Sequence, residues 1–279
     1  MTPGGLEVYP RILHDEPRVD VSTRTLPSGS QKFDELLGGG LTCGTSMLIT
    51  GAAGTGKSVL CTQYAHAAVH RNEKVLMYLF DERMSTFRLR TRTLGMSIED
   101  AIENGNLMIQ QIEPTDLSPG EFASQVVSVV EREKISLVVI DSINGYLQSM
   151  PEERLLPIQV HELLSFLSNN GVTSIMTLVQ HGIFGNPVDE AAEVSYLADT
   201  VVLMRYFEVR GSVRQAVSVV KKRSGNHERT IRECQVGQGG LTVGEPLRDF
   251  QGVLTGVPSY TGQGAPLMDE DSKKKRKAK

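Results

Sequence analysis

The chain has 279 residues, of which 39% are hydrophobic, and a formal net charge of −4, the properties of a globular protein with a substantial core. No apolar run approaches the roughly 20 residues that cross a bilayer, and the first residues lack the charged start and apolar stretch of a signal peptide, so we predict a cytoplasmic protein without a membrane partner. The three cysteines, Cys43, Cys61 and Cys234, have neither metal-ligand nor redox spacing, and we expect them to be reduced.

The start of the chain carries a short internal echo. Residues 4–8, GGLEV, match residues 239–243, GGLTV, at four of five positions. If the match is a true repeat, residues 1–24 are the last strand and linker of an upstream copy of the same domain, and the chain is the second half of a tandem protein. The alternative is a coincidence between two glycine-rich segments.

A phosphate-binding loop is the clearest motif. Residues 51–58, GAAGTGKS, fit the pattern G-x-x-x-x-G-K-[ST] at every fixed position, between an apolar strand at 46–50 and a helix at 59–69. Loop amides and the helix N-terminus attract phosphate, Lys57 supplies a positive charge to the β- and γ-phosphates, and Ser58 supplies a hydroxyl for Mg²⁺. We therefore predict that ATP and Mg²⁺ bind here. The expected nucleotide contacts are Gly51, Gly54, Thr55, Gly56, Lys57, Ser58 and Val59.

Strand and helix patterns alternate through the middle of the chain. Further strands are predicted at 74–80, 106–112, 136–140, 173–179 and 200–205, with helices at 84–94, 119–133 and 155–169. Most of these strands are apolar without clean alternation, as strands covered on both faces are, so we predict an α/β fold with a mostly parallel central sheet and helices on both faces. After residue 199, glycine-containing turns separate the runs 201–209, 213–221, 229–236 and 241–243, which predicts antiparallel hairpins that extend the sheet.

Acidic residues follow two of the predicted strands, at the sheet edge where α/β proteins place their ligands. Asp141 ends the strand at 136–140 and is predicted to hold Mg²⁺ or its waters together with Ser58. Asp81 and Glu82 follow the strand at 74–80, where a carboxylate can orient or deprotonate the group that attacks the γ-phosphate, and Asp81 is also a candidate metal ligand. A second interpretation is that Asp81 and Glu82 only cap the following helix.

Five motifs in the same order resemble the KaiC family within the RecA-like ATPases. They are residues 26–41, the phosphate loop, residues 80–82, residues 139–142 and residues 221–227, KKRSGNH. The resemblance runs from about Thr25 to Pro258 and also favours the tandem interpretation, because residues 4–11 look like the end of a first KaiC domain. It implies a RecA-like P-loop NTPase, residues 25–258 as the ATPase domain, and a homohexameric ring with nucleotide between subunits.

The resemblance also implies roles for individual residues. The family's general base is the first of two acids, usually glutamates, after the second strand, and here that residue is Asp81, one methylene shorter. Lys221 and Arg223 match cations that reach the γ-phosphate of the neighbouring subunit, and Lys222 and His227 stand at nearby nucleotide-contacting positions. From the residues alone, 221–223 would be interpreted as a solvated basic turn.

Ser195 and Tyr196 stand where a second KaiC domain has a Ser-Thr pair that receives phosphate. Ser195 fits this pattern and Tyr196 departs from it. The resemblance therefore implies serine autokinase and autophosphatase activity at Ser195, in signalling or clock-like regulation with regulatory protein partners. The alternative is that Ser195 and Tyr196 only cap and pack a segment at the subunit boundary.

Two other functions compete with this one. A DNA-dependent ATPase of recombination or repair uses the same fold, but the net charge of the body is −10 once the six positive charges of 273–279 are removed from −4, and the chain has no Trp, so we expect no nucleic-acid partner. A nucleotide-sensing scaffold with low turnover is favoured by Asp81 in place of glutamate. Residues 259–279 are predicted to be a flexible basic tail, with a weak anion-binding arm as the alternative.

Overall fold

The computed structural model describes residues 23–113, 118–148, 156–180, 195–209, 211–253 and 259–260. Residues 1–22 and 261–279, which include most of the upstream segment and of the basic tail, lie outside this part of the chain, and the domain boundaries stay predictions. None of the helices in the described part is both long and apolar enough to cross a membrane.

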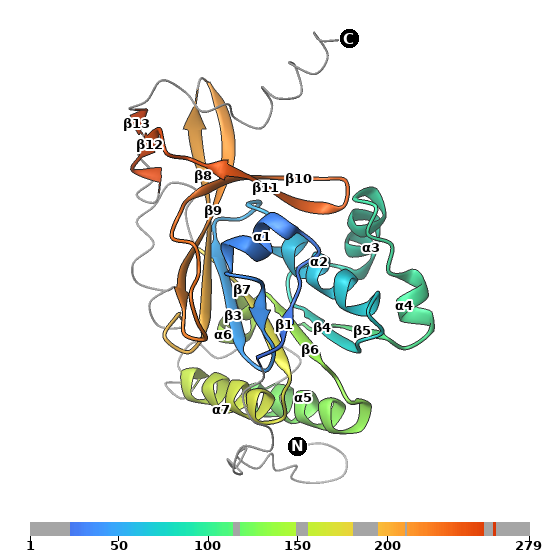
Figure 1. Ribbon diagram of the computed structural model, residues 1–279. Helices are drawn as coiled ribbons and strands as arrows, with labels where there is room; N and C mark the ends of the chain where they lie inside the picture. The colour runs from blue at the N-terminus through green and yellow to red at the C-terminus, as the bar shows by residue number, and fades with distance from the viewer. Residues whose placement is uncertain are drawn as a thin grey trace.

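Six of the strands in the nine-stranded main sheet are parallel and lie next to one another (Figure 1). They are β3 (Ser46–Gly51), β4 (Val75–Leu79), β5 (Leu107–Gln111), β6 (Leu137–Asp141), β7 (Thr173–Val179) and β8 (Thr200–Val209). Their order across the sheet is β8-β3-β7-β6-β4-β5, and each neighbouring pair is parallel. The predicted mostly parallel sheet is confirmed.

Helices cover both faces of this sheet, and each face has its own core. One face packs α1 (Gln31–Leu36), α2 (Lys57–Val69), α3 (Met84–Thr93) and α4 (Glu99–Glu103), and the other packs α5 (Pro119–Glu133), α6 (Ile143–Gln148) and α7 (Leu156–Asn169). In β3, Met47 and Ile49 belong to the first core and Leu48 to the second, so both faces of the strand are buried. This two-sided burial explains why the strands are apolar without alternation.

Antiparallel strands extend the sheet beyond β8, as predicted. They are β9 (Ser212–Lys222), β10 (Arg232–Gly237), which begins three residues later than the predicted run, and β11 (Gly240–Pro246). The β10–β11 hairpin lies against α2, where the buried amide of Leu241 donates to Oε1 of Gln63 at 2.7 Å. Two short ribbons stand apart from the main sheet, β1 (Thr25–Leu26) with β2 (Leu41–Thr42) and β12 (Phe250–Gln251) with β13 (Ser259–Tyr260).

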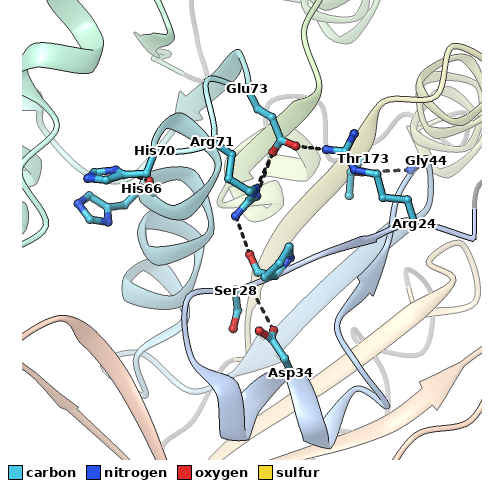
Figure 2. A network of polar contacts seen from close by, with 10 residues as sticks. Arg24, Ser28, Asp34, Gly44, His66, His70, Arg71, Glu73 and Thr173 are labelled. Atoms are coloured by element: carbon cyan, nitrogen blue, oxygen red, sulfur yellow. Dashed lines mark hydrogen bonds and ion pairs between the residues drawn. The ribbon is translucent and has the colours of Figure 1, made fainter.

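A polar network holds the C-terminal end of α2 (Figure 2). Glu73, whose side chain is 10% exposed, accepts hydrogen bonds from Arg71 and pairs with Arg24, and Arg71 also donates to the carbonyl of Pro27. This network ties the segment that enters the domain to the helix that follows the phosphate loop. Because α2 is fixed at this end and packed along its length, the position of its first turn is fixed as well.

Candidate nucleotide site

The phosphate loop begins where β3 ends and turns sharply into α2. Gly51 has φ of 155°, and a Cβ on this residue would clash with the carbonyl oxygen of Met204 on the neighbouring strand. Gly56, with φ of 104°, is the N-cap residue of α2, and as a glycine it has no side chain to accept a hydrogen bond from the first helix amides. The helix N-terminus therefore presents its backbone amides toward the loop, an arrangement that attracts phosphate.

Lys57 is folded into its own loop. Its side chain is buried, and Nζ donates to the carbonyl oxygens of Gly51 at 2.8 Å and Ala52 at 2.7 Å. Burial lowers the pKa of Lys57 to about 8, against the opposing effect of the Asp141 carboxylate. A phosphate group in the loop would add a second negative charge beside this buried cation.

Asp141 lies beside Ser58, at the C-terminal end of β6. Its Oδ1 accepts a hydrogen bond from Thr177 Oγ1 at 2.6 Å, and the Ser58 hydroxyl also bonds to its carboxylate. Burial raises the pKa of Asp141 in spite of these hydrogen bonds. A hydroxyl and a carboxylate brought together in this way are hard oxygen donors, so the residues present fit Mg²⁺. The structure thus brings together the two residues predicted as metal ligands from the loop and from β6.

Asp81 and Glu82 turn to different partners. Asp81 Oδ2 accepts a hydrogen bond from Ser142, the residue after Asp141, so this acid lies beside the C-terminal end of β6. Glu82 instead pairs with Arg90 on α3, at 2.6 Å. The interpretation that these acids cap the following helix is wrong. The N-cap residue of α3 is Arg83, without a side-chain cap hydrogen bond, and the Met84 amide donates to Gln111.

Lys221 and Arg223 lie toward the N-terminal ends of the parallel strands, away from the phosphate loop. Lys221 pairs with Val201, and Val201 pairs with Leu48, which is three residues before the loop and therefore about 10 Å from it along the strand. Within one chain these two cations and the phosphate loop are therefore at different ends of the parallel strands.

The basic segment 221–227 contacts backbone carbonyls. Lys221 Nζ donates to Ala198 at 2.6 Å and to Ser195 at 3.0 Å, and Arg223 donates to Tyr196 at 2.8 Å. Lys222 donates to Leu37 at 2.6 Å and Gly40 at 3.1 Å, and half-buried His227 lies beside Gly38 in the same turn. The interpretation as a solvated basic turn is wrong for Lys221 and Lys222, because both are half-buried and donate hydrogen bonds to backbone carbonyls.

Several residues of the site are not among the predicted contact residues. Thr177 and Ser142 orient the two aspartates, and Arg90 binds Glu82 and also contacts α2 through Ser58 and Thr62. Ser142 follows Asp141 directly, which is a local signal. Thr177 and Arg90 are brought in by strand order and helix packing, so no spacing in the chain points to them.

Comparisons with known proteins find one family and several relatives similar to this chain. The family model described as ATPase: KaiC matches residues 26–248. The circadian clock protein KaiC3 of Synechocystis sp. is 25% identical over 85% of this chain and 47% of its own length. The circadian clock oscillator proteins KaiC of Thermostichus vulcanus and Acaryochloris marina are 25% and 24% identical over 91% and 93% of this chain, and 49% of their own lengths. The chain therefore spans about half the length of the curated relatives it matches.

Proposed function

The chain belongs to the KaiC family of ATPases, and on that premise we propose that it hydrolyses ATP in sites that two subunits complete. The carrying observation is the separation of two halves of one site. The phosphate loop, Asp141 and Asp81 lie at the C-terminal ends of the parallel strands. Lys221 and Arg223 lie toward the N-terminal ends of these strands. Cations that cannot reach their own loop can reach a neighbour's in a closed ring, and a homohexamer is the ring that we propose.

The residues of one subunit supply most of the chemistry. Loop amides and Lys57 bind the β- and γ-phosphates, and Ser58 and Asp141 are the residues that would hold Mg²⁺, which when bound offsets negative charge on the phosphate oxygens. Asp81 orients the attacking water and accepts its proton while the oxygen bonds to the γ-phosphorus. The bond from this phosphorus to the bridging oxygen breaks, and ADP leaves with that oxygen.

The neighbouring subunit would supply Lys221 and Arg223. A cation delivered in this way stabilises the charge of the transferring phosphoryl group and is worth roughly 10³ to 10⁵ in rate in related chemistry. Lys222 and His227 would line the same surface beside the nucleotide.

Mixing two inactive variants tests the composite site. Lys57→Ala removes the loop cation, and Arg223→Ala removes the cation proposed to act on the neighbour, so each alone should hydrolyse ATP slowly. Mixed assemblies should regain part of the activity, because some interfaces pair an intact loop with an intact Arg223. Absence of rescue in assemblies proven to be mixed contradicts the proposal, and undiminished hydrolysis by Lys57→Ala contradicts the site itself.

One observation favours a second activity, autophosphorylation of Ser195. Lys221 and Arg223 bind the carbonyls of Ser195 and Tyr196, so a γ-phosphate brought to these cations would arrive beside Ser195. In that reaction the serine oxygen replaces water as the attacking group. Incubation with γ-labelled ATP should then give protein-bound label in addition to released phosphate, and Ser195→Ala should remove the bound label alone. Label that survives this change places the acceptor elsewhere. Regulation through protein partners, as in a clock, is part of the same proposal.

A further inference from the structure

Arg90 joins Glu82 to α2 through its guanidinium group. Nε and Nη2 donate to the two carboxylate oxygens of Glu82, at 3.0 and 2.6 Å. Nη1 donates to the carbonyl of Ser58 at 3.3 Å and to Thr62 Oγ1 at 3.1 Å, both on α2. The side chains of Arg90 and Glu82 are 19% and 20% exposed, and the guanidinium lies 5.2 Å from the centre of the Phe87 ring. This is a two-pronged, partly desolvated ion pair, the geometry in which such pairs are strongest.

The pair determines where the two neighbouring acids point. Both oxygens of Glu82 are engaged by Arg90, which draws this carboxylate onto the flank of α2. Asp81, one residue earlier, is exposed and is held by Ser142 beside the metal position. The short 81–82 segment is therefore anchored on both sides, to α2 through Glu82 and to the end of β6 through Asp81.

We propose that Glu82 and Arg90 are a positioning pair, which holds the neighbouring Asp81, the carboxylate proposed above as the base, in its place at the site. The inference rests on the proposed hydrolysis of ATP. Asp81 is a short side chain and must be placed accurately to reach a water at the γ-phosphate. The pair provides this placement, because it fastens the segment that carries Asp81 to the first turns of α2, which carry Lys57 and Ser58. A misplacement of about 1 Å in such a site can cost about a hundredfold in rate.

The opposite arrangement makes the opposite prediction. If Glu82 were the base, Arg90 would hold it away from the nucleotide, and removal of Arg90 would release it. Substitution of Arg90 would then leave the rate unchanged or raise it, while substitution of Glu82 would abolish it. In a positioning pair, the loss of either partner lowers the rate to a similar degree.

The experiment compares Glu82→Gln, Arg90→Gln and the double variant with the wild-type protein, by phosphate release and by ATP affinity. Each single variant should lower kcat by about tenfold to a hundredfold and change ATP affinity by less than about threefold. The double variant should be no slower than the worse single one, because the second change removes a contact already lost. Arg90→Lys, which keeps the charge but not the fork, should fall between Arg90→Gln and the wild type.

Arg92→Gln is the matched control, since Arg92 lies two residues further along the same helix. Its side chain is 72% exposed and forms an ion pair with Glu99, away from Asp81 and Glu82. It should behave as the wild type. Thermal unfolding of every variant separates loss of placement from loss of the fold. An Arg90→Gln variant that hydrolyses ATP as fast as or faster than the wild type contradicts the positioning role of Glu82 and Arg90. It does not contradict the proposed hydrolysis of ATP. An Asp81→Asn variant with full activity overturns the assignment of Asp81. Full activity in Lys57→Ala, or no turnover in the wild type, overturns the proposed function and this inference together.

Discussion

At the scale of single residues, the nucleotide site is built from charges that burial disfavours. Desolvation lowers the pKa of Lys57 and raises the pKa of Asp141, so each shift opposes the charged form. Both residues lose solvation on folding, and in the proposed site a bound nucleotide and its metal would restore favourable interactions to them. Their shifted pKa values therefore indicate that the buried charges destabilise the nucleotide-free protein, as is common for residues at functional sites.

A pH-dependent stability is the prediction for Lys57. Its pKa falls from 10.5 in the unfolded chain to about 8 in the folded protein. Below pH 8 both states hold the proton and the buried charge costs stability in full. As the pH rises from 8 toward 10.5, the folded state releases the proton first, so the free energy of unfolding rises, by up to about 1.4 kcal/mol per pH unit.

Urea unfolding of the nucleotide-free protein and of Lys57→Met checks this prediction. The unfolding free energy of the wild type minus that of the variant should increase between about pH 8 and about pH 10. With saturating Mg-ATP the increase should vanish over this range, because the phosphates favour the charged lysine. A difference that stays constant or falls without nucleotide contradicts the assigned environment of Lys57.

At the scale of elements, the β10–β11 hairpin lies next to the phosphate loop. Side chains of Val236 and Leu241 lie close to Gly56, and Gln63 on α2 accepts the hydrogen bond of the Leu241 amide. This hydrogen bond to the buried side chain of Gln63 connects the antiparallel part of the sheet to the helix that follows the loop. The hairpin is therefore part of the site although it contains no motif.

We expect Gln63→Leu to lower the free energy of unfolding by about 1 to 3 kcal/mol, because it leaves the buried Leu241 amide without an acceptor. ATP affinity should fall as well, since the hairpin is loosened above Gly56. Gln238→Leu is the control on the same hairpin. Its exposed side chain donates to Thr93, and its loss should change stability by less than about 0.5 kcal/mol. Equal stability of the two variants would show that Gln63 does not hold the hairpin.

At the scale of the whole molecule, charge separates the proposed ATPase from a DNA-dependent one. With the tail set aside the net charge is −10, and phosphate backbones are bound mainly by lysine and arginine. A net negative charge of this size does not suit a surface that follows a nucleic-acid strand.

Accordingly, single-stranded DNA should leave the rate of ATP hydrolysis unchanged. The rate should also vary little between low salt and about 0.2 M salt, whereas a DNA-activated rate falls steeply over that range. Phosphate release with and without DNA at both salt concentrations provides the measurement. Stimulation of several-fold by DNA at low salt would favour the recombination or repair alternative.

The sequence by itself determined the features that depend on neighbours along the chain. The helix Pro119–Glu133 and the strand Thr173–Val179 have their predicted bounds, because the apolar pattern that marks them depends on neighbouring residues. The phosphate loop could likewise be recognised, since its residues are contiguous and follow a strand. Helices α1, α4 and α6 escaped the pattern, because six residues or fewer are too short to show a period.

Only the tertiary structure decided which distant residues meet. Arg90 reaches Ser58 and Thr62 because α3 lies beside α2, and Thr177 reaches Asp141 because β7 lies beside β6. Lys221 lies away from the loop of its own chain because β9 runs antiparallel to β8. Each of these facts depends on strand order, strand direction or helix packing. These are set by burial of apolar faces over the whole domain, and the spacing of polar residues along the chain does not record them.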